Sequence, residues 1–85
     1  MSSWNYVLDE AVFHFFISRP ASERRRLMAA FEELRAEPNR DGDYTIKDAA
    51  GRSLTVLAFR PFLITYWLDA FVSEIRIVDV QRIQF

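Results

Sequence analysis

Arginine is the residue type in this sequence that is best suited to carry chemistry. The chain has eleven basic residues, and all of them except Lys47 are arginines. A guanidinium group stays charged at neutral pH and grips carboxylates and phosphates through a planar fork of N–H donors. It is a poor general base, and His14 and Lys47 add few groups that could exchange a proton near neutral pH. The basic residues therefore point to contacts with anions.

The densest basic patch is the run Arg24, Arg25 and Arg26, with Arg19 before it. One interpretation is a contact with phosphates or with an acidic partner. The other is a solvated helix face, partly paired with Glu23 and with neighbours three and four residues on. The solvated face is the simpler of the two, and we take it as the expectation.

Composition excludes several kinds of site. The chain has no cysteine and one histidine, which rules out a disulfide scaffold, a thiolate zinc site and a cysteine nucleophile. We find no glycine-rich phosphate loop, no Ser-His-Asp set and no metal-ligand spacing, so we expect neither cofactor nor metal. A net charge of −1 shows that the chain as a whole is no nucleic-acid-binding polycation.

The hydropathy pattern predicts a cytoplasmic protein that does not enter a membrane. An uncharged stretch such as 61–68 is far shorter than a membrane span. The first residues have no basic segment and soon reach Asp9 and Glu10, so we expect no signal peptide. With 85 residues, half of them hydrophobic, the chain predicts a single domain over 1–85.

The first half of the sequence predicts a short strand over 4–8 and then two helices. Asp9 can cap the first helix, which would run to about Ser18. Its apolar residues lie in pairs four apart, Val12 with Phe16 and Phe13 with Ile17, and predict one wide buried face. The second helix would begin near Pro20 and end at Ala36. Its apolar stripe consists of Leu27, Phe31 and Leu34, with Ala30 beside it.

The second half has the period of a sheet. Turn residues separate four predicted strands, over 44–47, 53–59, 62–68 and 71–83. Short connections between successive strands favour antiparallel pairing. The sequence therefore predicts an α+β fold of two layers, with an N-terminal strand and a helical hairpin packed on a mostly antiparallel sheet of four to five strands. Whether the first strand pairs inside the sheet or at its edge stays open.

Alternation along the last strand assigns its residues to two faces. Glu74, Arg76, Val78, Val80 and Arg82 would share one face, and Ile75, Ile77 and Asp79 the other. The helices should cover the face with Ile75 and Ile77. We therefore expect Arg76 and Arg82 on the open face, where neighbouring strands could bring Lys47 and Arg60 near them.

Four aromatic residues lie on two neighbouring predicted strands: Phe59, Phe62, Tyr66 and Trp67. Such side chains can stack on the bases of single-stranded RNA. They also provide ordinary core and cross-strand packing. Packing is the interpretation that we expect.

The order of the segments resembles that of the RelE/ParE toxin superfamily over nearly the whole chain. The segments that carry the resemblance are 24–27, 34–38, 51–57, 62–67 and 74–80. The resemblance implies the toxin of a type II toxin–antitoxin (plasmid stabilization) pair, neutralised by a cognate antitoxin. RelE-type members are mRNA interferases that cut mRNA on the ribosome and inhibit translation, whereas ParE-type members poison DNA gyrase.

For the RelE-type activity, the resemblance implies a cationic set made of Lys47, Arg60, Arg76 and Arg82. The sequence departs from the family pattern elsewhere. Residues 54–57 offer no lysine, and Leu63 stands where the family has an arginine. Gln84 and Phe85 stand where a histidine and a tyrosine would serve as acid and base. Two hypotheses therefore stay open: a ribosome-dependent endoribonuclease, and a non-catalytic binding protein of the same fold, either an inhibitor of a gyrase-type target or a degenerate toxin.

Overall fold

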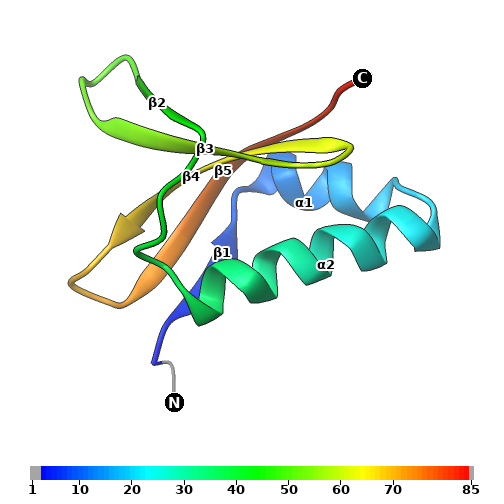
Figure 1. Cartoon of the computed structure of the whole chain (residues 1–85), viewed down its shortest axis with the longest axis horizontal. Helices are drawn as coiled ribbons and strands as arrows, with labels where there is room; N and C mark the ends of the chain where they lie inside the picture. Colours follow the sequence, from blue (N-terminus) through cyan, green and yellow to red (C-terminus); the bar gives the residue numbers. More distant parts are fainter. Residues whose placement is uncertain (1–2, 85) are drawn as a thin grey trace.

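The computed structural model describes residues 3–84, which form two helices and five strands (Figure 1). In chain order the elements are β1 (Asn5–Leu8), α1 (Glu10–Ile17), α2 (Ala21–Ala36), β2 (Tyr44–Lys47), β3 (Ser53–Phe59), β4 (Phe62–Asp69) and β5 (Glu74–Arg82). The predicted strand over 71–83 is therefore shorter than expected. Residues 71–73 belong to the β4–β5 turn, where Ser73 adopts a left-handed φ of 54°.

The strands form one sheet in the order β1-β5-β4-β3-β2. Every neighbouring pair is antiparallel except β1 and β5, which run parallel. The predicted α+β fold of two layers is confirmed, with five strands. The open question about the first strand is also answered, since β1 lies at the edge of the sheet beside the last strand. Among the described residues, no helix is long and apolar enough to cross a membrane.

The core lies between the two helices and one face of the sheet. The predicted stripe of α2 is confirmed, because Leu27, Ala30, Phe31 and Leu34 are all fully buried. The sheet contributes Leu57, Phe62, Ile64, Tyr66, Ile75, Ile77 and Val80 to the same cluster. The buried apolar face of α2 fixes the helix against the sheet and so fixes where the arginines of its first turns can reach.

The first helix is less buried than the sequence predicts. Val12 is buried and Phe15 and Phe16 are partly buried, but Phe13 and Ile17 are 48% and 54% exposed. The expectation of one wide buried face is therefore wrong for this second pair. Helix α1 has only eight residues, and the sheet and α2 contact a narrower stripe of it than the apolar sequence offers.

A β-bulge in β5 changes which residues face the helices. The pairing goes from Tyr66 opposite Ile77 to Thr65 opposite Asp79, so Val78 has no partner across the ladder. An extra residue shifts the alternation of a strand by one position. Val80 therefore joins the core beside Ile77.

The same bulge overturns one prediction about the arginines. Arg82 lies two positions after Val80 and opposite Phe62, a buried core residue, so it shares the helix face. Arg76 precedes the bulge and lies opposite Trp67 on the open face. The expectation that Arg76 and Arg82 lie together on the open face is wrong, because simple alternation does not allow for the bulge.

Candidate anion-binding site

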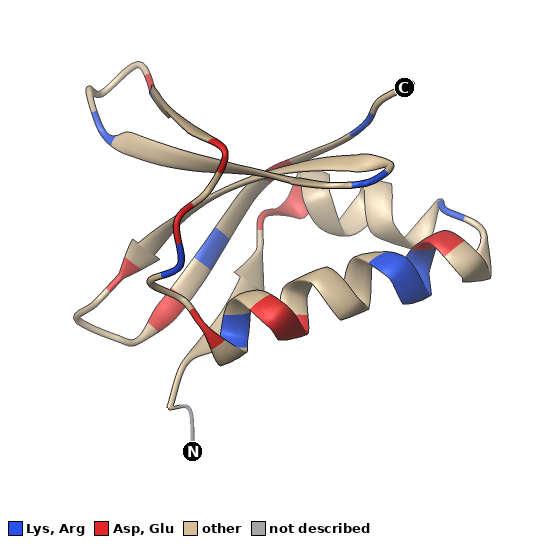
Figure 2. Cartoon of the chain, viewed as in Figure 1, with Lys and Arg blue, Asp and Glu red and all other residues tan. Residues whose placement is uncertain are grey.

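One end of the molecule gathers six arginines from three separate segments. Arg19 lies between the helices, Arg24, Arg25 and Arg26 lie in the first turns of α2, Arg60 lies in the β3–β4 turn, and Arg82 ends β5. In Figure 2 the blue segments at the start of α2, just before it, in the β3–β4 turn and near the C-terminus lie on the same side of the molecule. They are six of the eleven basic residues of a chain whose net charge is −1. The positive charge is therefore concentrated here.

Contacts from Arg26 join α2 to the β3–β4 turn. Its Nε donates a hydrogen bond to the backbone oxygen of Arg60 at 2.8 Å. Its guanidinium carbon lies 4.0 Å from the centroid of the Phe59 ring, a cation–π geometry. These two contacts hold the turn over the helix, and with it the side chain that the turn carries.

The stretch between the helices is fixed in a similar way. Arg24 donates through Nη1 to the backbone oxygen of Arg19. The guanidinium of Arg19 lies 5.1 Å from the Phe15 ring, which packs edge-on against the Phe62 ring. Arginine side chains stack well on aromatic faces while keeping donors for other groups. The aromatic residues beneath this end therefore orient its arginines.

Arg19 and Arg82 share one carboxylate, that of Glu23. Arg82 Nε lies 3.4 Å from Glu23 Oε2, and Arg19 Nη1 lies 3.7 Å from Glu23 Oε1. Glu23 lies in the first turn of α2, where the helix dipole favours an acidic residue. The first turn of α2, the inter-helix stretch and the end of β5 thus meet at a single charged group.

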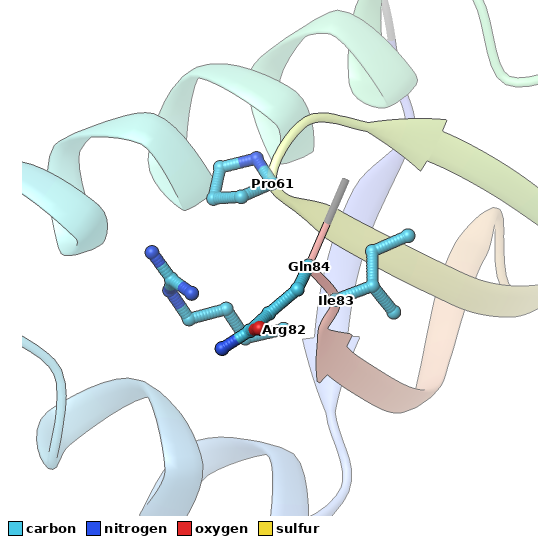
Figure 3. Close-up of a pocket in the computed structure, with 4 residues that line it drawn as sticks. All are labelled: Pro61, Arg82, Ile83 and Gln84. Carbon is cyan, nitrogen blue, oxygen red and sulfur yellow. The ribbon is translucent and has the colours of Figure 1, made fainter.

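A pocket of about 390 Å³ opens beside this group and is lined by Pro61, Arg82, Ile83 and Gln84. Figure 3 shows the Arg82 side chain reaching from the end of β5 toward the helices, whereas Ile83 points the other way. The lining residues offer a guanidinium, an amide and apolar atoms, and none of their side chains exchanges a proton near neutral pH. Phe85, which the resemblance to the toxin family sets at a tyrosine position, lies outside the described residues.

The four residues of the predicted cationic set do not meet at one surface. Arg60 and Arg82 lie at the same end, since Ile83 N donates to Pro61 O at 2.8 Å. Lys47 lies opposite Ser53 and donates to its Oγ at 2.8 Å. Ser53 begins β3 and Arg60 follows its end, a separation of roughly 20 Å along a strand of this length. The structure thus brings together two of the four.

Arg76 belongs to a different cluster on the open face of the sheet. It pairs with Glu74 at 3.5 Å and lies opposite Trp67, whose ring carries the Arg52 guanidinium 4.1 Å from its centroid. The four aromatic residues are divided accordingly. Phe62 and Tyr66 are buried in the core, as expected, whereas Phe59 and Trp67 each pack under an arginine.

The residues that sequence reasoning underestimated are Arg19, Glu23 and Arg26. The run of arginines was the signal, but helical spacing alone favoured a solvated face. The contacts of Arg26 with Phe59 and with the Arg60 backbone span more than thirty residues, and local pattern does not contain them. Among the described residues, no group of three or more His, Cys, Asp or Glu side chains could hold a metal ion.

Comparison with known proteins identifies the fold. No family model and no curated protein matches the sequence. A solved structure does match: the crystal structure of the archaeal RelE–RelB complex from Pyrococcus horikoshii OT3, with a TM-score of 0.73 and 17% sequence identity over 94% of each chain. The fold is therefore that of the RelE toxin, as the segment order predicted.

Proposed function

We propose that this protein is a RelE-like toxin of a toxin–antitoxin pair, which inhibits translation by binding RNA in the cytoplasm. The observation that carries the proposal is the group of six arginines at one end of the molecule, where Arg82 lines a pocket, on a scaffold with the fold of RelE. Phosphate contacts from arginine supply most of the affinity of non-specific RNA binding. A chain of net charge −1 with one strongly basic end would bind RNA through that end.

The more specific form of this proposal is a ribosome-dependent mRNA endoribonuclease. Cleavage of RNA through the ribose 2′-hydroxyl needs a base, an acid and cations that stabilise the charge developing on the phosphate. Arg82, which lines the pocket, could supply the cationic part, together with Arg60 in the adjacent turn. Lys47 and Arg76 would have to act from other surfaces, so we assign them no part in a single catalytic group.

A second candidate is a non-catalytic binding protein of the same fold. The observation that favours it is the lining of the pocket, where the polar side chains are those of Arg82 and Gln84. Neither side chain can act as a general acid or a general base near neutral pH. Such a protein would block its target by occupying it. The endoribonuclease and the binding protein differ in whether RNA is cut.

We propose that the partner is a cognate antitoxin. The structural neighbour is a RelE–RelB complex, which supports a partner of this kind. An acidic segment of the partner would suit the arginine-rich end by charge. Binding there would also cover the surface that we assign to RNA, which is a direct way to neutralise the toxin.

Expression in a bacterial host without the antitoxin tests the proposal. We expect the wild-type protein to stop growth and amino-acid incorporation, and Arg82→Ala to relieve both. Arg76→Ala is the matched control, because it removes an arginine from the same strand but from the opposite face, and it should inhibit like the wild type. Mapped mRNA ends distinguish the two candidates, since only the endoribonuclease creates new ends. Normal growth and translation with folded wild-type protein would contradict the proposal.

A further inference from the structure

Glu23 lies where an anion bound by Arg19 and Arg82 would lie. Its two carboxylate oxygens lie 3.7 Å and 3.4 Å from the nearest guanidinium nitrogens. The side chains of Glu23, Arg19 and Arg82 are 22%, 30% and 41% exposed, so the group borders solvent and is only partly screened by it. The carboxylate is thus an anion supplied by the chain itself, and it pairs with an arginine that lines the pocket.

The three side chains satisfy one another incompletely. Both separations exceed the 2.7–2.9 Å typical of a charge-assisted hydrogen bond. Glu23 Oε1 and Arg19 Nε are buried atoms that make no hydrogen bond within the described part of the chain. A buried polar atom without a partner is costly. Arg19 therefore has an N–H donor that Glu23 does not satisfy, and Glu23 has an oxygen that neither arginine satisfies, so the three side chains are loosely paired.

The ion pairs that Glu33 and Glu32 form within the described residues differ from this arrangement. Arg40 meets Glu33 at 3.4 Å in a pair with one guanidinium and one carboxylate. Arg35 and Glu32 form a similar exposed pair on α2. At Glu23, by contrast, two guanidinium groups from segments far apart in the sequence face one carboxylate, which leaves a net positive charge.

We propose that Glu23 is a built-in competitor that occupies the phosphate position between Arg19 and Arg82 until a phosphate group displaces it. The inference rests on the proposed function only for the source of the phosphate, an RNA backbone. The two non-bridging oxygens of an RNA phosphate share one negative charge, as the two oxygens of the carboxylate do, and two guanidinium forks can bind them at the same time. When the phosphate enters, the Glu23 carboxylate turns to solvent.

This arrangement sets a threshold for binding. A ligand must overcome both the attraction of Glu23 for the two arginines and its repulsion of the incoming phosphate. A single small anion gains little else in return, whereas an RNA strand also contacts the remaining arginines of this end. Glu23 would therefore lower the affinity for both ligands by a similar factor, and an extended polyanion would still bind because of its other contacts.

Glu23→Gln tests the proposal, because it keeps the shape of the side chain and removes its charge. We expect about tenfold tighter binding of a single-stranded oligoribonucleotide, measured by fluorescence anisotropy at physiological salt, which corresponds to about 1.4 kcal/mol. A parallel titration with inorganic phosphate, followed through the Arg19 and Arg82 Nε–H signals in NMR spectra, shows whether a small anion takes the same position.

Glu33→Gln is the matched control, since it removes a carboxylate of α2 that pairs with Arg40 and should leave affinity unchanged. Combining Glu23→Gln with Arg82→Ala should abolish the gain in RNA affinity, because Arg82 is then no longer present to be freed for the phosphate. Glu23→Ala serves as a second variant if the glutamine protein folds poorly, as judged by circular dichroism. Unchanged affinity for both probes in a folded Glu23 variant would overturn the proposal.

The outcomes separate this inference from the proposed function. Tighter binding by Glu23→Gln in a protein that never inhibits translation would support the competitor and reject the toxin. Translation arrest that depends on Arg82 but gains nothing from Glu23→Gln would support the toxin and reject the competitor. Tightening of both probes, with inorganic phosphate binding far more weakly than the oligoribonucleotide, identifies an RNA backbone as the ligand, and comparable affinities for both identify a small-anion site.

Discussion

The phenol of Tyr66 is the least satisfied polar group in the core. The residue is 1% exposed, and its hydroxyl makes no hydrogen bond within the described part of the chain. Burial raises the pKa of this phenol above its ordinary value, although the charge of Arg40 opposes the shift. The ring fills core volume that a phenylalanine ring would also fill, so the hydroxyl adds cost without a matching contact.

We predict that Tyr66→Phe raises the free energy of unfolding by about 1 kcal/mol, because it removes a buried hydroxyl that has no partner. Urea denaturation followed by tryptophan fluorescence measures the change. Tyr44→Phe is the control, since Tyr44 is half exposed and should change little. A loss of stability in Tyr66→Phe would mean that the hydroxyl contributes a contact after all.

The same residue predicts a pH dependence at the alkaline end. Since the folded pKa of Tyr66 is raised, the folded protein keeps the phenolic proton to a higher pH than the unfolded chain does. With respect to this group, the fold keeps its full stability below a pH of about 10 and loses stability as the pH rises toward the folded pKa, because the unfolded chain ionises first. Burial and the Glu32 charge raise the pKa of Tyr6 in the same direction. Unfolding free energies measured above pH of about 9 should fall more steeply in the wild type than in Tyr66→Phe.

Arg26 is the arginine whose contacts most directly support structure. We predict that Arg26→Ala lowers the free energy of unfolding by about 1 kcal/mol, because it removes the hydrogen bond to Arg60 O and the stacking on Phe59. Arg25→Ala removes the neighbouring exposed arginine and should change the stability by less than about 0.5 kcal/mol. Equal effects in thermal denaturation would contradict a bridging role for Arg26.

At the scale of elements, the bulge in β5 decides what the C-terminal arginine can do. Without the bulge, the Arg82 side chain would lie on the open face of the sheet with Arg76, away from α2. With Val78 outside the ladder, Arg82 lies on the helix face and meets Glu23 in the first turn of α2. One extra residue therefore places this arginine beside Glu23, at the arginine-rich end, rather than on the open face of the sheet.

The loop before β2 crosses β3 at close range. Asp43 N donates to Val56 O at 2.8 Å, and Asp43 Oδ2 accepts from Ala58 N at 2.6 Å. A Cβ added to Gly42 would lie 2.8 Å from Val56 O and would also meet Thr55 Cγ2. Only glycine lets the two backbones approach so closely.

We therefore predict that Gly42→Ala lowers the free energy of unfolding by about 1–3 kcal/mol, the usual cost of overpacking. Chemical denaturation measures the loss. Asp41→Ala alters the exposed neighbouring residue and should stay within about 0.5 kcal/mol of the wild type. Wild-type stability in Gly42→Ala would show that the loop can move away from β3 at little cost.

For the whole molecule, the decisive property is the uneven distribution of charge. A net charge of −1 would weaken binding to RNA if the charges were evenly spread. Six arginines from three segments instead form one basic end, while Arg52 and Arg76 lie with Trp67 on the open face of the sheet. Affinity for RNA should therefore depend on salt through that end alone.

We predict that the slope of log K against log salt becomes shallower by about 0.7 in Arg25→Ala, the value for one lost phosphate contact with single-stranded RNA. Arg52→Ala removes an equal charge from the other surface and should leave the slope unchanged. Anisotropy titrations at several salt concentrations measure both slopes. A change in Arg52→Ala and none in Arg25→Ala would place the RNA on the open face.

The sequence by itself determined the elements and the face that α2 buries. The stripe of Leu27, Phe31 and Leu34 and the strands over 44–47 and 53–59 follow from local hydropathy and turn residues, and the structure has them where they were expected. The segment order was enough to identify the RelE-like fold. Periodicity and turn chemistry are properties of neighbouring residues, so they can be seen along the chain.

Only the tertiary structure decided which charged side chains meet. Arg82 reaches Glu23 because of a bulge in β5 that the local sequence pattern does not predict. Lys47 and Arg76 lie apart from Arg82 because of strand order and register. A shift of one residue in register moves a side chain to the other face of a sheet. That shift depends on packing between strands distant in the sequence, and for this reason the site was out of reach of the sequence alone.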